Sequence, residues 1–472
     1  MISEKDQNKL VAALPPDAGI DEISFCEAGE LALFPGITLK DVPQHIRVLV
    51  SARPETGSNI KIELWLPAEG WNGDLVGVGN GGYAGMLPSF SLAMPLRLGF
   101  AAVTTDMGTS AGPDCGIGNR AVWTDFGHRA THLMATIGKG LTAAYYGTPV
   151  RYAYFIGNST GGQQALSEAQ RYPEDFDGIL ASSPAYDRVN LHMAFVHDWQ
   201  ALTAPGVEPF TPELQAAVAQ AFLRKKAGEG ERREEDLFFL RPDKIIVKRN
   251  DLEGIGLSER QIDALLNVYR GLPGIYEPSL TPGSENDGLG ICRRADRDAF
   301  AFEFFYLFRW VLGKDFDFTA FDFEKDGATV REALSSYVDA TNPDLTAFRD
   351  HGGKLLLIHG TADPIIPMAS SMRYFRAVQE RMGDTADFFR LFLMPGMAHG
   401  FGGPGVQDYV MGLPALPKDE KHLGLLTLKA WVEEGKAPDV ITPVAYHPSE
   451  NPLDILRPGG IAWEREVRPY KE

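Results

Sequence analysis

The chain has 472 residues, 44% of them hydrophobic and 23% charged, a composition typical of a folded globular protein large enough for one α/β domain with an insertion. Its formal net charge of −18 argues against a nucleic-acid partner, because no basic tract is present to neutralise phosphates, and weakly against an anionic membrane surface. No apolar stretch approaches the ~18 residues of a membrane-spanning helix, so we expect no membrane association.

The N-terminal segment and the cysteines favour a reducing compartment. The charged segment 1–6 lacks the apolar region of a secretory signal. Cys26, Cys115 and Cys292 are far apart and form no metal or redox motif, although one disulfide is left open. We therefore expect a reduced, cytoplasmic protein without metal or cofactor, and a homo-oligomer is left open.

Strands and helices alternate in the first 190 residues. Residues 45–50 and 60–66 alternate polar and apolar side chains, which predicts antiparallel strands with one solvated face. Buried parallel strands are then expected at 75–78, 100–105, 150–156 and 178–183, with helices at 128–146 and 163–171. The pattern predicts an α/β fold with a mostly parallel, doubly wound sheet.

The pattern changes near residue 190. From there to residue 343 the chain predicts helices joined by charged and Pro/Gly-rich loops. Strands resume at 354–360 and 388–394, with helices at 369–381 and 423–434. We therefore predict a catalytic domain of residues 1–190 and 344–472 and an inserted lid subdomain of residues 191–343.

Aromatic side chains crowd residues 300–323 of the predicted lid. At helical spacing such residues usually form a core, but some of them could line a pocket for an aromatic substrate. Arg309 lies among them and is interpreted either as a partner for a carboxylate or as a surface charge.

A candidate nucleophile follows the strand at 150–156. Gly157-Asn158-Ser159-Thr160-Gly161 is a G-x-S-x-G pentapeptide between this strand and a helix. That context is typical of a nucleophile elbow, in which a sharp turn exposes the serine hydroxyl above the sheet. The alternative is a plain strand-to-helix turn with Ser159 as the helix N-cap.

Two later loops offer the partners that a serine nucleophile needs. Asp363 follows the strand at 354–360, and His399 follows the strand at 388–394. Both fall at the carboxyl ends of late strands, in the order Ser, Asp, His, so we assign Asp363 as the orienting acid and His399 as the base. His359 is expected to be buried and structural, and His351 exposed.

An oxyanion hole requires two preorganised N–H donors. The first is expected to be the backbone N–H of Thr160, and the second that of Gly81 or Gly82 in the glycine-rich loop 79–85. A dinucleotide-binding reading of this loop is weak, because no acidic residue ends a following strand.

With these loops placed, the chain resembles the tannase and feruloyl esterase family of α/β-hydrolases, which also holds hydrolases of mono-hydroxyethyl terephthalate. The resemblance covers roughly residues 60–440 and is carried by segments 79–85, 105–108, 157–162, 168–179, 359–364, 394–400 and 402–405. It implies a Ser-Asp-His triad at Ser159, Asp363 and His399, an inserted lid, and esters of aromatic acids as substrates.

Two departures from the family pattern stand out. Relatives usually have disulfide-linked cysteines just before the serine and just after the histidine, where this chain has Asn158 and Gly400. We expect the Asn158 side chain to hydrogen-bond the histidine loop instead. Family lids also commonly carry a calcium loop, but residues 250–257 offer few oxygen ligands, so we predict no structural calcium.

The sequence thus predicts a serine carboxylesterase that acts on hydroxycinnamic, feruloyl or galloyl-type esters, with a small-molecule aromatic ester as its partner. The alternatives are an esterase for other small esters, such as aromatic polyester fragments or acylated metabolites, and a non-enzymatic binding protein on the same fold.

Overall fold

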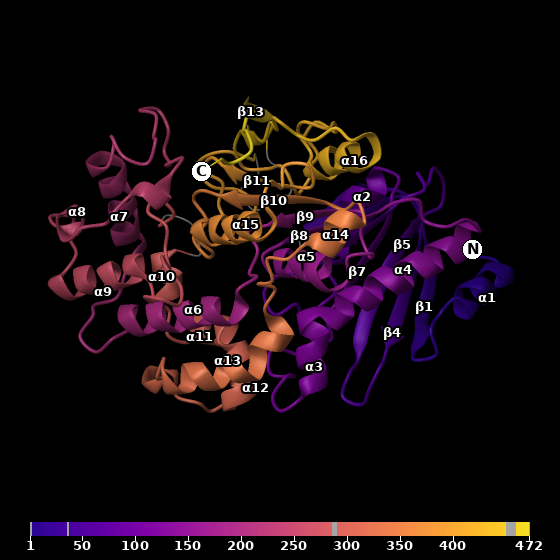
Figure 1. Cartoon of the computed structure of the whole chain (residues 1–472), viewed down its shortest axis with the longest axis horizontal. Helices are drawn as coiled ribbons and strands as arrows, with labels where there is room; N and C mark the ends of the chain where they lie inside the picture. The colour runs from indigo at the N-terminus through magenta and orange to yellow at the C-terminus, as the bar shows by residue number, and fades with distance from the viewer. Residues whose placement is uncertain (1, 35–36, 286–289, 450–458, 472) are drawn as a thin grey trace.

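A twisted sheet runs through the centre of the protein (Figure 1). The computed structural model describes residues 2–34, 37–285, 290–449 and 459–471. In this part of the chain the sheet has nine strands in the order β1-β4-β5-β7-β6-β8-β9-β10-β11. Their bounds are Ala18–Cys26, His45–Ala52, Ile60–Pro67, Ala101–Thr105, Leu75–Val78, Ala153–Asn158, Gly178–Ser182, Lys354–Gly360 and Phe389–Met394.

The six strands β7, β6, β8, β9, β10 and β11 pair in parallel. Strands β1, β4 and β5 form an antiparallel extension at one edge. This agrees with the predicted mostly parallel sheet. Helices cover both faces, and successive strand residues alternate between two cores: Leu355 and Leu357 pack in one, Leu356 and Ile358 in the other.

The first core lies under α4 (Ala130–Tyr146), α5 (Thr160–Arg171) and α15 (Ala369–Met382). The second lies under α2 (Ala93–Arg97) and α16 (Gly424–Glu434). Helices α4, α5, α15 and α16 fall where the sequence predicts helices, except that residues 125–129 ahead of α4 form a π-helical turn.

Several elements were not predicted from the sequence. They include α1 (Glu4–Ala12), the edge strand β1, the hairpin β2–β3 (Gly29–Phe34, Ile37–Val42), α3 (Arg120–Thr124) and the strand pair β12–β13 (Val444–Tyr446, Ile461–Glu464). Strand β1 is largely solvated and includes polar and acidic residues on both faces, so its hydrophobic periodicity is weak.

The 171 residues from 183 to 353 are inserted between the hydrogen-bonded neighbours β9 and β10. In the described residues this insertion is helical: α6 (Arg188–Leu202), α7 (Pro212–Lys225), α8 (Arg249–Leu252), α9 (Glu259–Arg270), α10 (Ile291–Arg294), α11 (Ala299–Phe304), α12 (Tyr306–Leu312), α13 (Lys325–Val338) and α14 (Thr346–Asp350). Residues 202–291 contain a separate hydrophobic cluster, whereas α11 to α13 pack into the first core. The domain boundaries at 190/191 and 343/344 stay a prediction.

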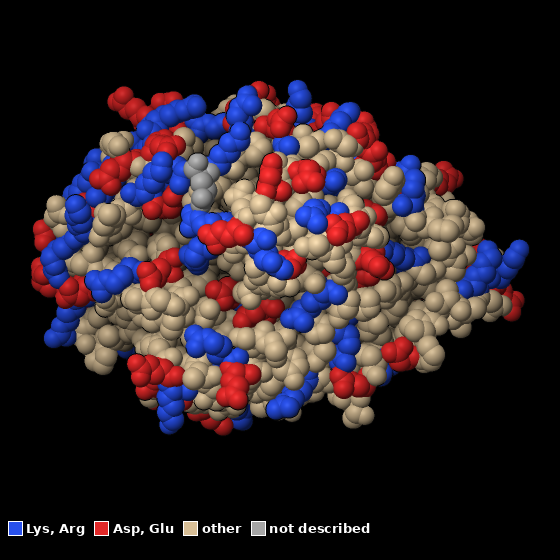
Figure 2. Space-filling model, viewed as in Figure 1, with Lys and Arg blue, Asp and Glu red and all other residues tan. Residues whose placement is uncertain are grey.

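Acidic and basic side chains are interspersed over the face shown in Figure 2. No described helix has both the length and the apolar character that are needed to cross a bilayer.

Candidate active site

Ser159 stands at the turn between β8 and α5, at the carboxyl edge of the sheet. Its backbone has φ 62° and ψ −115°, a strained conformation for a residue with a side chain. Its N–H donates to the Ser182 carbonyl on β9 at 3.0 Å. The Ser159 side chain makes no capping hydrogen bond, so the turn has the geometry of a nucleophile elbow rather than that of an N-cap.

The glycines around Ser159 allow strand and helix to approach closely. A Cβ on Gly157 would lie 2.3 Å from the Gly161 carbonyl oxygen. A Cβ on Gly79, in the facing loop, would lie 2.6 Å from the Gly161 Cα. Backbone contact at these positions leaves no room for a side chain, which explains why the turn contains this glycine spacing.

Asp363 and His399 meet across two neighbouring loops. His399 donates its Nδ1–H to Asp363 Oδ2 at 2.8 Å. The other carboxylate oxygen accepts the backbone N–H groups of Ile365 and Ile366 at 2.8 and 2.9 Å. The buried carboxylate is therefore fixed by the main chain and holds the imidazole in one orientation.

His359 is buried, as predicted, and lies beside this pair. Because a carbonyl can only accept, its Nε2–H donates to Ile366 O at 2.7 Å, and its Nδ1 accepts the Ser371 hydroxyl at 2.7 Å. Burial alone would raise the pKa of Asp363, but the charge of His399 and hydrogen bonds from both histidines hold this pKa well below its usual range. Asp363 is therefore ionised at neutral pH and stabilises a protonated His399.

Other histidines are engaged elsewhere. His128 bonds the Tyr172 hydroxyl at 2.8 Å, and His132 pairs with Asp175 at 2.6 Å, while His351 is exposed as predicted. These contacts give His128 and His132 structural roles outside the candidate site.

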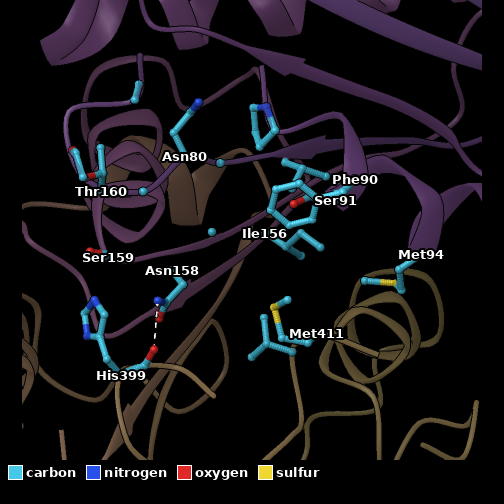
Figure 3. A pocket seen from close by; sticks show the side chains of 18 of the residues that line it. Asn80, Phe90, Ser91, Met94, Ile156, Asn158, Ser159, Thr160, His399 and Met411 are labelled. Atoms are coloured by element: carbon cyan, nitrogen blue, oxygen red, sulfur yellow. Dashed lines mark hydrogen bonds between the residues drawn. The ribbon is translucent and has the colours of Figure 1, made fainter. Parts of the chain in front are cut away.

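Ser159 and His399 line one cavity of about 870 Å³. Figure 3 shows the His399 ring next to Ser159 at one end of it. The Nε2 of His399 has no hydrogen-bond partner in the part of the chain that the structure describes. This nitrogen can therefore accept a proton from a serine or a reacting ligand in the cavity.

The loop 79–85 is anchored against the start of α5. Gly161 N–H donates to the Asn80 carbonyl at 2.7 Å, and Asn80 Nδ2 donates to Thr105 O at 2.8 Å. The backbone N–H groups of Gly81, Gly82 and Thr160 bond no group among the described residues. All three residues line the cavity, so they remain the candidates for an oxyanion hole.

Arg188, the first residue of α6, joins the two sides of this candidate hole, and no local sequence signal marks it. Its guanidinium donates to the Thr160 hydroxyl and to the Gly82 carbonyl, both at 2.9 Å, and bonds the Tyr306 hydroxyl. The Thr160 hydroxyl also donates to Gly82 O, at 2.6 Å. Buried against the Phe126 ring, Arg188 therefore fixes the Gly82–Tyr83 peptide, which directly follows the candidate donor Gly82 N–H.

Asn158 makes the predicted contact with the histidine loop. Its Nδ2 donates to the His399 carbonyl at 3.3 Å, as the dashed line in Figure 3 marks. A Cβ built on Gly400 would lie 2.3 Å from Asn158 Cγ. The side chains of these two positions therefore face each other.

Restoring a cysteine pair here should stabilise the protein. We expect Asn158→Cys with Gly400→Cys to raise the free energy of unfolding by about 1–3 kcal/mol when oxidised, since the long enclosed loop favours stabilisation and left-handed Gly400 opposes it. Denaturant unfolding with and without reductant measures the difference, and the single Asn158→Cys variant is the control. A cross-linked double variant that is no more stable than its reduced form would contradict the expectation.

The aromatic block of residues 300–323 is divided between two roles. Most of its buried side chains, such as Phe305, Phe308 and Trp310, pack in the first core, whereas Phe304 and Tyr306 line the cavity. Arg309 is buried and pairs with Asp114 at 2.8 Å. The surface interpretation of Arg309 was therefore wrong, and the carboxylate that it meets belongs to the protein.

Two lysines bind residues 250–257, the segment compared above with a calcium loop. Lys225 Nζ donates to three backbone carbonyls of this segment at 2.7, 3.0 and 3.1 Å. Lys226 Nζ lies 3.2 Å from the Asp251 carboxylate. Two ammonium groups thus supply positive charge here, and the absence of structural calcium stays a prediction. The three cysteines are free thiols, so the disulfide left open above does not form.

Over most of its length the chain is similar to known esterases. Residues 46–225 and 300–459 match the family model described as Tannase and feruloyl esterase. An uncharacterized esterase of Xanthomonas campestris is 30% identical over 95% of this chain and 85% of its own length. Feruloyl esterase B of Aspergillus niger is 30% identical over 83% of this chain and 78% of its own length.

The fold is that of a solved relative. The crystal structure of feruloyl esterase B from Aspergillus oryzae matches with a TM-score of 0.85 at 24% identity, covering 98% of this chain and 96% of that chain. The predicted α/β-hydrolase fold is thereby confirmed.

Proposed function

The chain belongs to the tannase and feruloyl esterase family and is a carboxylic ester hydrolase, and we propose that it cleaves esters of hydroxycinnamic or galloyl-type aromatic acids through a serine-bound acyl-enzyme. The observation that carries this proposal is one cavity lined by Ser159, by His399 with Asp363 hydrogen-bonded behind it, and by an aromatic wall. Residues of three separate loops converge there, which a binding protein would not require.

In the proposed mechanism, Ser159 Oγ attacks the ester carbonyl while His399 Nε2 takes its proton. Asp363 stabilises the imidazolium that forms. The N–H of Thr160 and that of Gly81 or Gly82 bind the oxyanion, after which His399 protonates the departing alcohol. Water, activated by the same histidine, then hydrolyses the acyl-enzyme.

The aromatic acid fits the part of the cavity under the insertion, which we call the aromatic lobe. It is lined by His192, Phe195, Phe304 and Tyr306. Burial and the nearby Arg188 charge lower the pKa of His192 well below its ordinary value, so its imidazole is neutral. The lobe thus combines aromatic rings with one uncharged polar ring, which supports an aromatic acid.

A panel of methyl esters tests the proposal. We expect kcat/KM for methyl ferulate or methyl gallate to exceed that for methyl acetate at least about tenfold, because only the aromatic esters fill the aromatic lobe. Equal values would contradict the aromatic assignment. A preference for mono-hydroxyethyl terephthalate over both would favour the polyester-fragment alternative.

Arg188 is expected to act as a positioning residue for this reaction. Arg188→Met removes the guanidinium that bonds the Gly82 carbonyl and the Thr160 hydroxyl, so the two residues that carry candidate oxyanion donors are held less firmly. We expect kcat on methyl ferulate to fall about 100-fold with KM changed little. Tyr306→Phe, which removes only one hydroxyl from the same cluster, should have a smaller effect. A raised KM at unchanged kcat would show that Arg188 serves substrate binding instead.

A further inference from the structure

The cavity extends beyond Ser159 in a direction away from the aromatic lobe. This second part, which we call the apolar arm, is lined by Phe90, Met94, Leu98, Ile156, Met411 and Leu413. Figure 3 shows Phe90, Met94, Ile156 and Met411 grouped on the side of the pocket away from Ser159 and Thr160. The catalytic mechanism proposed above leaves this part of the cavity without a role.

The apolar arm lies over the second core of the sheet. Ile156 comes from β8, Met94 from α2, and Met411 and Leu413 from the loop after β11. Met94 and Met411 are only partly buried, so their thioether side chains face the cavity. Flexible methionines adapt to apolar ligands of varied shape, and burying a hydrocarbon against them removes apolar surface from water.

The arm opens to solvent at its outer end. Thr38, Lys40 and Lys418 line the same cavity there and are exposed. An occupant can therefore enter from solvent, and its far end can remain hydrated. This arrangement suits an extended chain better than a compact apolar molecule.

The inner end of the apolar arm lies on the same side of Ser159 as His399. Asn158 lines the cavity between Ile156 and Ser159 and donates to the His399 carbonyl. The loop with Met411 and Leu413 continues the chain from His399. Because His399 must protonate the departing oxygen, the alcohol of the ester has to lie on this side.

We propose that the apolar arm binds the alcohol portion of the substrate, and that this portion is an alkyl chain. The inference rests on the proposed function and sharpens its substrate class: an aromatic acid in the aromatic lobe, esterified to a hydrocarbon alcohol in the arm. Burial of the alkyl chain in the arm stabilises the bound substrate and the transition state equally. It should therefore lower KM more than it raises kcat.

The test compares methyl, butyl and hexyl ferulate as substrates of the whole enzyme. We expect kcat/KM to rise roughly 2- to 4-fold per methylene until the arm is filled, mainly through KM. Met94→Trp and Met411→Trp, which fill the arm, should reduce the ratio of kcat/KM for hexyl over methyl ferulate toward one. Leu237→Trp, at a side chain that is 64% exposed outside the cavity, is the matched control and should keep the wild-type ratio.

Equal kcat/KM across the ferulates, or a gain that persists in both filled variants, would overturn the proposal. Methyl, butyl and hexyl acetate test the arm independently of the proposed aromatic acid. If kcat/KM rises with alcohol length among these acetates but no ferulate is hydrolysed, the arm still binds the alcohol, and the proposal of an aromatic acid is overturned. If kcat/KM for methyl esters rises with the length of the acyl chain, and Met94→Trp and Met411→Trp abolish this rise, the arm binds the acyl chain and its assignment to the alcohol is overturned.

Discussion

Ser159→Ala is expected to lower kcat on methyl ferulate by about 10⁴-fold or more, because the other hydroxyl at the elbow, that of Thr160, is held by Gly82 O and Arg188. The fold should be retained, since alanine meets the same backbone strain at φ 62° as serine and the Ser159 side chain makes no capping bond. The measurements are steady-state kinetics and labelling by a fluorophosphonate, which should modify the wild type at residue 159 and leave the variant unlabelled.

The control for this variant is Ser167→Ala. Ser167 is a buried serine on the same helix, α5, and its hydroxyl donates to Gly127 O at 3.4 Å. It lies outside the cavity lining, so kcat should stay within a few-fold of the wild type. Retained turnover in Ser159→Ala would remove Ser159 as the nucleophile and leave the family assignment untouched.

The places of Ser159, Asp363 and His399 in the fold could be predicted because each depends on a local pattern, and their catalytic roles stay a prediction. A buried strand followed by a glycine-flanked serine and a helix predicts the elbow. Asp363 and His399 follow two further strands, and parallel strands place their carboxyl ends at one edge of the sheet. The Asn158 contact could be predicted for a similar reason, since that residue stands where relatives have a cysteine.

Other parts of the site could not be predicted, because they depend on contacts between distant segments. Arg188 and Gly82 are 106 positions apart, and nothing near Arg188 in the sequence marks its target. Periodicity likewise cannot distinguish Phe304, which faces the cavity, from Phe305, which faces the core. The hairpin β2–β3 has two strands of only six residues each, and its place beside the second core depends on contacts of Leu31, Leu39 and Val42 with segments distant in the sequence.

Asp363→Asn should lower kcat by about 10³- to 10⁴-fold. The asparagine carbonyl can still accept from Ile365 and Ile366, so the loop should keep its shape. Its amide would then face His399 Nδ1 and favour the tautomer with the proton on Nε2, which cannot accept the serine proton. Asp344→Asn, at a carboxylate that pairs with Arg381 away from the cavity, is the control and should leave kcat unchanged.

The stability of Asp363→Asn as a function of pH tests whether residue 363 is charged in the wild type, independently of its effect on the orientation of His399. Because the folded-state pKa of Asp363 is lowered, its carboxylate stabilises the fold above the unfolded-state pKa of about 3.9 and loses this effect as the pH falls below it. The difference in unfolding free energy between wild type and Asp363→Asn should therefore shrink as the pH falls below about 4. A stability difference that keeps growing below about pH 4 would contradict an ionised Asp363, and kcat within tenfold of wild type would assign the orientation of His399 to another group.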